Sequence, residues 1–307
     1  MKSLNKIVLG LAFAIITTHS FAQDPNFRLN QFNSLLLNPA QAGVNSYSDI
    51  SVIGISQWNS LPGAPRTAAF SGNFKLGENF GLGTAFMQDE LGPVKSFNVS
   101  INTAYQLRLS RKWRFSVGLK GIIGNTTVAL QDLSVIDSDP DMMSNLNSGL
   151  SFNAGYGFLL YSKNLYFGYS QPRVANISFQ DRNMSSFVDS KGGHIGYIGS
   201  DLSMGTSWKW RPNIVARYIP SLPLVMDINS IFTSNGGLDL GLSYQLNSSV
   251  GAMVGININN MFYLGYSYSF PLTQLSSVTM QTHEFGLRYM FSKKSNPSYQ
   301  GPRFFNN

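Results

Sequence analysis

The sequence predicts an all-β fold, a closed antiparallel transmembrane β-barrel of the outer-membrane type with about 14 strands. Only 12% of its 307 residues are charged, whereas soluble domains carry about 25%, which indicates that much of the surface does not face water. No apolar run approaches the roughly 20 residues that a membrane-spanning helix needs. Segments of about ten residues alternate between apolar and polar or small side chains, and a closed barrel is the structure that spans lipid with such strands.

The start of the chain, residues 1–22, is expected to be a signal peptide. Lys2 and Lys6 provide a positive charge, residues 7–16 are apolar, and Ser20-Phe21-Ala22 has the small-x-small pattern of a cleavage site. The mature chain would then begin at Gln23. The chain contains no cysteine, which excludes disulfides and thiolate metal sites and suits export into an oxidising periplasm.

Residues 23–48 are expected to form an N-terminal segment on the periplasmic side. Within it, the box Asn38-Pro39-Ala40-x-x-Gly43 has two compatible interpretations. The first is a rigid turn, because proline fixes φ, asparagine favours turn starts and glycine allows positive φ. The second is that the whole segment folds against or into the mouth of the barrel, where such a turn would fix its position.

Residues 49–291 are expected to form the barrel. The alternation is clearest in 97–109, 238–247 and 262–270, where every second residue from Phe97, Leu238 and Phe262 onward is predicted to face lipid. Strands are predicted at 49–58, 65–75, 79–87, 96–109, 112–123, 149–161, 164–171, 194–204, 207–219, 222–233, 237–247, 249–258, 260–270 and 281–291.

The connections between these strands suggest an orientation. Those after even-numbered strands are short, whereas several after odd-numbered strands are predicted to be long, at 88–95, 124–148, 172–193 and 271–280. Short periplasmic turns alternating with longer outer loops would place both termini in the periplasm. Residues 292–307 would form a polar C-terminal tail.

The predicted inward face is rich in glycine and shows few charges. Inward glycines permit strong strand coiling or close packing in the lumen, and they would suit packing against a peptide or plug. A wide general porin would be expected to carry more inward charge, so the pattern argues against that role.

The last predicted strand carries three candidate site residues, His283, Glu284 and Arg288. By alternation, Glu284 and Arg288 face the lumen while Phe285 and Leu287 face lipid. The favoured interpretation is that they pair with opposite charges on neighbouring strands, because buried charges need partners. The alternative is that they contribute to a lumen surface for a partner segment.

Several spaced motifs follow one another in order from Asp24 to Phe291. They are Asp24-Pro25-Asn26-Phe27, Gln31-Phe32-Asn33, Asn38-Pro39-Ala40-Gln41-Ala42-Gly43, Gln57-Trp58, Gly63-x-Pro65-x-Thr67, Gly168-Tyr169-Ser170-Gln171-Pro172, Gly265-Tyr266-Ser267-Tyr268 and Thr282-His283-Glu284. Together they resemble the PorP/SprF family of outer-membrane proteins of the type IX secretion system. Two features depart from the family pattern. Ser269 replaces the acid that usually ends its Y-S-Y-D strand, and the chain continues as a polar tail beyond Phe291.

This resemblance implies a non-enzymatic role in the outer membrane of Bacteroidetes-type cells. Such a barrel would help to export or anchor a secreted surface protein or adhesin, would contact periplasmic secretion-ring components, and would in some cases serve gliding motility. The alternative function is an outer-membrane channel for small or hydrophobic solutes.

Other functional classes have little support in the sequence. No G-x-S-x-G motif, phosphate loop or metal-spaced cluster is present, so no enzyme, cofactor or metal is expected. Asp137-x-Asp139-Pro140-Asp141 resembles the start of a calcium loop, but Met142 stands where glycine is needed and Ser148 where glutamate is needed. The net charge is +7, yet the basic residues are scattered, which argues against nucleic acid and favours contact with lipid headgroups.

Overall fold

The computed structural model describes residues 27–32, 34–58, 61–130, 145–178, 193–220, 222–272 and 281–291. The expected signal peptide, the polar tail, the Asp137–Asp141 motif and much of the long loops therefore lie outside the described residues. None of the helices in these ranges is long and apolar enough to cross a membrane.

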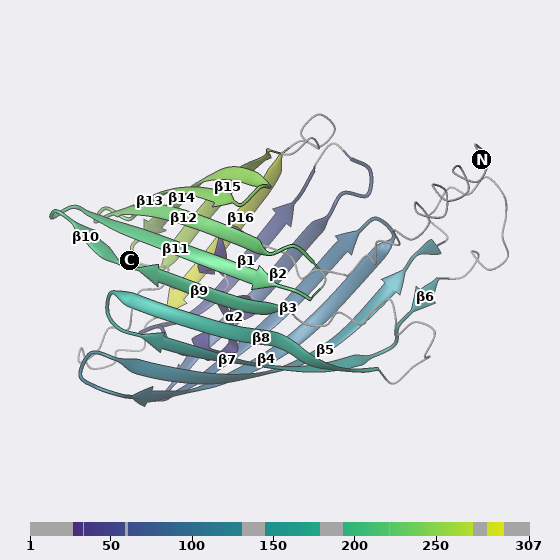
Figure 1. The fold of residues 1–307 in the computed structure, drawn as a ribbon, viewed down its shortest axis with the longest axis horizontal. Coiled ribbons are helices and arrows are strands. Elements are labelled where there is room, and N and C mark those ends of the chain that lie inside the picture. The colour runs from purple at the N-terminus through teal and green to yellow at the C-terminus, as the bar shows by residue number, and fades with distance from the viewer. Residues whose placement is uncertain are drawn as a thin grey trace, which may run out of the picture.

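Among the described residues, fourteen antiparallel strands close into a barrel (Figure 1). Closure occurs where β1 pairs with β16, from Ser48 opposite Phe291 to Ser56 opposite His283. The fourteen strands are β1 (Ser48–Ser56), β2 (Arg66–Leu76), β3 (Phe80–Leu91), β4 (Val94–Arg108), β5 (Arg114–Val128), β7 (Ser151–Tyr161), β8 (Leu165–Ser178), β9 (His194–Ser200), β11 (Trp208–Tyr218), β12 (Val225–Ser234), β13 (Leu238–Gln245), β14 (Ser249–Ile258), β15 (Phe262–Pro271) and β16 (Thr282–Phe291). Two short strands, β6 (Leu146–Asn147) and β10 (Leu202–Met204), add to β5 and β11.

The predicted fold class and strand order are confirmed, and the predicted faces agree with burial. On β13, for example, Leu242 is 66% exposed and faces outward, whereas Ser243 is 5% exposed and faces the lumen. The same alternation runs along β4 and β15. The outer face is therefore the apolar band that lipid requires.

Several predicted connections are wrong because the strands are longer than expected. β3 and β4 continue through 88–95 and meet at Gly92-Pro93, where the positive φ of Gly92 permits the tight turn. β5 continues to Val128 and β8 to Ser178. Pro172 in β8 is tolerated because β8 bulges there: Ala154 pairs with Ala175 and Tyr156 with Gln171, so three residues of β8 lie opposite one residue of β7.

The expectation of few inward charges is also wrong. Seven strand residues with charged side chains are buried on the inner face: Asp49, Lys120, Arg211, Asp227, Asp239, Glu284 and Arg288. Several are paired with opposite charges. Arg288 pairs with Asp49 at 3.5 Å and Arg217 with Asp227 across adjacent strands, and Arg211 pairs at 3.6 Å with Asp201, which stands between β9 and β10. Pairing across strands is what permits such charges to be buried, and it cannot be seen when each strand is considered alone.

The described residues before β1, 27–32 and 34–47, lie inside the barrel. It contains three short helices, η1 (Asn30–Phe32), α2 (Ser34–Leu37) and η2 (Pro39–Gln41), which pack against the inner faces of β1, β3, β4, β5, β7, β8 and β16. Figure 1 shows α2 enclosed by the ring of strands. We refer to residues 27–47 as the plug.

Candidate functional site

The plug runs along the lumen from the end that carries the longer loops to the end that carries the short turns. Its first part contacts Glu284, which pairs with Ile55 near the loop between β1 and β2. Its last part, at Gly43, lies against Gly81 near the turn between β2 and β3. The chain then turns back into β1 at Ser48.

The short-turn half of the plug is held by Asn38, a residue of the predicted box that is completely buried. Its Oδ1 accepts a hydrogen bond from the backbone N–H of Ala40 at 2.8 Å, which caps the η2 helix begun by Pro39. Its Nδ2 lies 3.0 Å from the carbonyl oxygen of Phe158, 3.3 Å from that of Tyr169, and 3.0 Å from the hydroxyl of Tyr197. One side chain therefore rigidifies the turn and ties it to β7, β8 and β9, so the two interpretations of the box hold together.

Inward glycines allow the plug backbone to touch the wall. A Cβ at Gly118 would lie 2.2 Å from the backbone nitrogen of Ala40, and one at Gly157 would lie 2.0 Å from Oδ1 of Asn38. Because real Cβ atoms do not approach other atoms so closely, only glycine fits at these positions. The predicted link between inward glycines and a packed lumen thus has a direct steric basis.

Gly43 closes this part of the site. It has a φ of +65°, which favours glycine, and a Cβ there would lie 2.5 Å from Cα of Gly81. Its N–H donates to Oδ1 of Asn73 at 2.7 Å, and its carbonyl oxygen accepts from Nε2 of Gln106 at 2.9 Å. Glycine is therefore required at position 43 for two reasons: its φ is positive, and Gly81 leaves no room for a Cβ.

The long-loop half of the plug is held by Glu284. Its carboxylate accepts hydrogen bonds from the backbone N–H groups of Arg28 and Leu29, all at 2.9 Å. The guanidinium of Arg28 donates to the hydroxyls of Ser243, at 2.9 Å, and Ser249. Glu284 thus binds main-chain donors of the plug instead of a charged side chain on a neighbouring strand.

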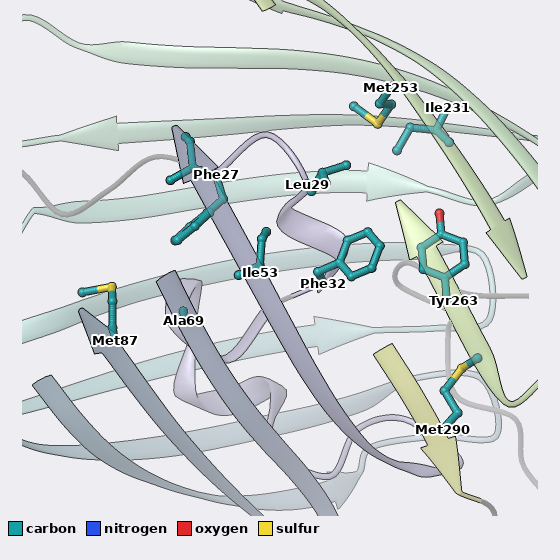
Figure 2. Packing of buried hydrophobic residues seen from close by; sticks show 11 residues of the cluster. Phe27, Leu29, Phe32, Ile53, Ala69, Met87, Ile231, Met253, Tyr263 and Met290 are labelled. Carbon is teal, nitrogen blue, oxygen red and sulfur yellow. The ribbon is translucent and has the colours of Figure 1, made fainter. Parts of the chain in front are cut away.

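Phe32 joins the two halves. Its ring lies over the bare backbones of Gly265 and Gly286 and stacks on Tyr263, with ring centroids 4.9 Å apart. The guanidinium carbon of Arg288 lies 5.3 Å from the centre of the Phe32 ring, within the range of a cation–π contact. Figure 2 shows Phe32 facing Tyr263 among the buried apolar side chains of the lumen.

The remaining predicted site residues lie in different parts of the barrel. Arg288 pairs with Asp49, as the favoured interpretation expected. His283 points away from the lumen, and its Nδ1 lies 2.7 Å from the hydroxyl of Tyr266. Gln57 and Trp58 belong to the connection between β1 and β2, where Gln57 donates its N–H to the carbonyl of Pro65 at 3.0 Å and Trp58 has a φ of 49°. These three residues do not contact the plug in any interaction found among the described residues.

Sequence reasoning missed the wall residues that bind the plug. Ser116 donates to the carbonyl of Ala40 at 2.8 Å, Ser170 to that of Leu37 at 2.5 Å, and Gln41 donates to the hydroxyl of Tyr197 at 2.7 Å. Of these residues, only Tyr197 could have been selected from the sequence, because a large aromatic residue on an inward position needs a partner for its hydroxyl. Serine is too common on inward positions to be selected without knowing the register.

The site is chemically a binding surface for a polypeptide. It consists of carbonyl, hydroxyl and carboxylate groups that satisfy main-chain and amide donors, together with glycines that admit a backbone. Within the described ranges, no group of three or more His, Asp or Glu side chains is placed to hold a metal ion.

The fold and the site define a plugged membrane β-barrel. Solved structures with a similar fold include the toluene transporter TodX of Pseudomonas putida, with 11% identity, a TM-score of 0.51, and coverage of 90% of this chain and 100% of that chain. The toluene transporter TbuX of Ralstonia pickettii has 12% identity, a TM-score of 0.50 and coverage of 85% and 93%. The outer membrane protein Omp33 of Acinetobacter baumannii has 9% identity, a TM-score of 0.46 and coverage of 81% and 100%.

Residues 19–289 match the family described as type IX secretion system membrane protein PorP/SprF, and the chain belongs to that family. It is therefore an outer-membrane β-barrel with a general role in type IX secretion. No curated protein matches the chain.

Proposed function

We propose that this barrel helps to export or anchor a secreted cell-surface protein at the outer-membrane end of the type IX secretion machinery. The observation that carries the proposal is the family match, which spans residues 19–289 and thus nearly the whole barrel. The role is that of a binding partner and not of an enzyme. We further propose that a secreted adhesin is its cargo or client, and that gliding motility is one process it serves.

The plug supports this role over that of an open channel. Leu29, Asn38, Ala40 and Ala42 are completely buried between the strands, so the described part of the lumen is occupied by the protein's own chain. A closed barrel also offers no strand edge to a partner across its membrane-spanning part. Recognition of a partner would therefore use the surfaces at the two ends of the barrel.

We assign the secreted partner to the long-loop end, at 124–148 and 172–193. Strands β3, β4, β5 and β8 extend toward that end beyond their predicted limits. β8 also continues beyond the last residue that pairs with β9, because that pairing stops at Ser170 opposite Ile195. The periplasmic secretion components would meet the opposite end. There the plug returns to the surface at Asn45–Tyr47, beside the short turns.

The test is deletion of the gene, followed by a census of surface proteins and a solute-uptake assay. We expect one surface protein to be lost from the cell exterior, with uptake unchanged. Complementation of the deletion with altered genes tests which end of the barrel is needed. Replacing 179–192 by a Gly/Ser linker should abolish display of the surface protein, whereas the same replacement of the exposed turn 77–79 should not. An unchanged surface proteome with reduced uptake of one solute class would favour the solute channel instead.

A second measurement identifies the partners directly. A pull-down of the tagged, folded barrel from detergent-solubilised outer membrane is expected to recover the missing surface protein and components of the secretion ring. Recovery of neither, from cells in which the barrel is folded and abundant, would contradict the proposal.

A further inference from the structure

The two halves of the plug are attached to the wall in different ways. Residues Asn38–Gly43, which we call the anchor, touch the wall backbone to backbone over glycines and are bound from β2, β4, β5, β7 and β9. Residues Phe27–Leu29, which we call the latch, have their main-chain donors Arg28 and Leu29 bound to a single carboxylate, that of Glu284. Loss of one side chain would therefore affect the latch far more than the anchor.

The inner face of β12–β14 carries a group of polar side chains on the short-turn side of the latch, which we call the polar group. Near the short-turn end of these strands lie Thr233, Asp239 and Asn257. Thr233 Oγ1, Asp239 Oδ1 and the side-chain amide atoms of Asn257 are buried and make no hydrogen bond to other groups in the described ranges. Buried polar atoms of this kind are normally satisfied by water, so this part of the wall is suited to hydration.

The latch separates this polar group from the long-loop end. Leu29 is completely buried in an apolar cluster with Ile231 and Met253, which lie on β12 and β14, as Thr233 and Asn257 of the polar group do. Figure 2 shows Leu29 pointing toward these two side chains. Above them, Arg28 fills the space beside Ser243 and Ser249. An apolar constriction of this type blocks ions because it excludes water.

We propose that Phe27–Leu29 is a releasable latch, and that its release from Glu284 opens a pore for small hydrated ions along β12–β14 while the anchor keeps the plug attached. Moving Leu29 away from Ile231 and Met253 would join the polar group to the polar residues Ser243, Ser249 and Asp227 on the long-loop side of the latch. The resulting path is lined by hydroxyls, amides and charges of both signs. This activity belongs to the barrel itself and does not depend on the proposed role in secretion.

The first measurement is conductance of the purified mature protein in planar lipid bilayers, with potassium chloride as the probe. The wild-type barrel is expected to be mostly closed, and Glu284→Ala to raise the time-averaged conductance severalfold. Glu284→Gln, which keeps one acceptor oxygen, should be intermediate. Glu78→Ala removes an equal charge from an exposed turn and should leave conductance unchanged. Heat-modifiable electrophoretic mobility verifies folding, and if Glu284→Ala does not fold, Glu284→Gln and Arg28→Ala decide the question.

The second measurement reports release of the latch independently of conductance. Because the chain has no cysteine, Leu29→Cys gives a single labelling site, and a bulky maleimide should label it only when Glu284 is also replaced. Ala42→Cys, in the buried anchor, should stay protected in both backgrounds. A wild-type barrel that conducts as well as Glu284→Ala would overturn the proposal. So would a folded Glu284→Ala barrel that is labelled but does not conduct, or one that is neither labelled nor conducting.

Discussion

Gly118 on β5 lies directly against the backbone of Ala40 in the plug. A methyl group at Gly118 would come within 2.2 Å of the Ala40 nitrogen, and the obstructing atoms are backbone atoms that cannot rotate away. We therefore expect Gly118→Ala to destabilise the folded barrel by about 1–3 kcal/mol, the usual cost of overpacking, or to displace the anchor.

The matched control for this change lies three residues further along the same strand. Gly121 faces outward, and a Cβ there would meet nothing within 4 Å. Gly121→Ala should therefore leave the midpoint of denaturant unfolding in lipid vesicles nearly unchanged. Equal midpoints for the two variants would show that the plug does not press on β5 as the structure indicates.

Asn38 should be sensitive to the loss of its amide donors. Asn38→Asp keeps an oxygen that can accept from the Ala40 N–H, but it places a carboxylate beside the carbonyl oxygens of Phe158 and Tyr169. Asn38→Ala loses both functions and leaves a small void. Leaving buried polar groups without partners costs about 1–3 kcal/mol, and we expect Asp to be worse than Ala because it adds a buried charge.

Limited proteolysis of the folded barrel measures this effect on the plug itself. Cleavage at Arg28 by trypsin should be slow in the wild-type barrel, where Arg28 is 9% exposed, and faster in both variants. Faster cleavage in Asn38→Ala than in Asn38→Asp would indicate that the cap of η2 matters more than the contacts to β7 and β8.

The barrel could be predicted from the sequence because its strongest signals are local. The alternation on β4, β13 and β15 repeats every two residues, so the lipid-facing side can be assigned within each strand. The ends of β3, β5 and β8 could not be found this way. Polar residues such as Asp89 and Glu90 resemble a loop in sequence, yet they continue the ladder opposite Thr67 and Arg66.

The candidate site was predictable only in part, because it depends on contacts between distant segments. The box at Asn38–Gly43 and the inward position of Glu284 were identified, since both carry local signals. That Glu284 binds the backbone of Arg28 and Leu29, 256 and 255 residues away, follows from the closure of the barrel and the path of the plug. Neither is encoded in the periodicity of a single strand.

Substitutions on the two faces of β13 should have different effects. A charge on the outer face should impair membrane insertion, whereas a charge on the inner face should displace the latch. Leu242 is 66% exposed on the outer face, and Leu242→Arg should impair membrane insertion by about 2–4 kcal/mol if it lies near the midplane. Ser243 lies under the guanidinium of Arg28 at 2.9 Å. Ser243→Arg should therefore allow insertion but expel the latch, because two guanidinium groups would compete for the same space.

Folding into vesicles and tryptic cleavage at Arg28 distinguish these two effects. Leu242→Arg should lower the folded fraction with no change in cleavage of the molecules that do fold. Ser243→Arg should fold and be cleaved faster. The reverse pattern would mean that the register of β13 is shifted by one residue, which would exchange its two faces.

The direction of the plug predicts where the mature N-terminus is accessible. Arg28 and Leu29 contact Glu284 near the long-loop end, and the rest of the plug fills the path toward the short turns. If cleavage follows Ala22, the few residues before Phe27 span at most about 14 Å at roughly 3.3–3.6 Å per residue, too little to return through the barrel. We therefore predict a mature N-terminus that is accessible at the long-loop end, in place of the periplasmic position expected from the sequence, whereas β16 ends at the short-turn end, with Phe291 opposite Ser48.

Epitope tags on intact cells test this orientation. A tag directly after Ala22 and a tag within 179–192 should both be reached by an antibody from outside, because long loops of such barrels face the exterior. A tag after Phe291 should be reached only when the outer membrane is permeabilised, and it serves as the internal control for membrane integrity. If the tag after Ala22 were shielded while the tag in 179–192 was reached, the plug would have to enter the barrel from the periplasmic end. The contact between Glu284 and the backbone of Arg28 and Leu29 could then not exist in the membrane, because those residues would lie at the opposite mouth.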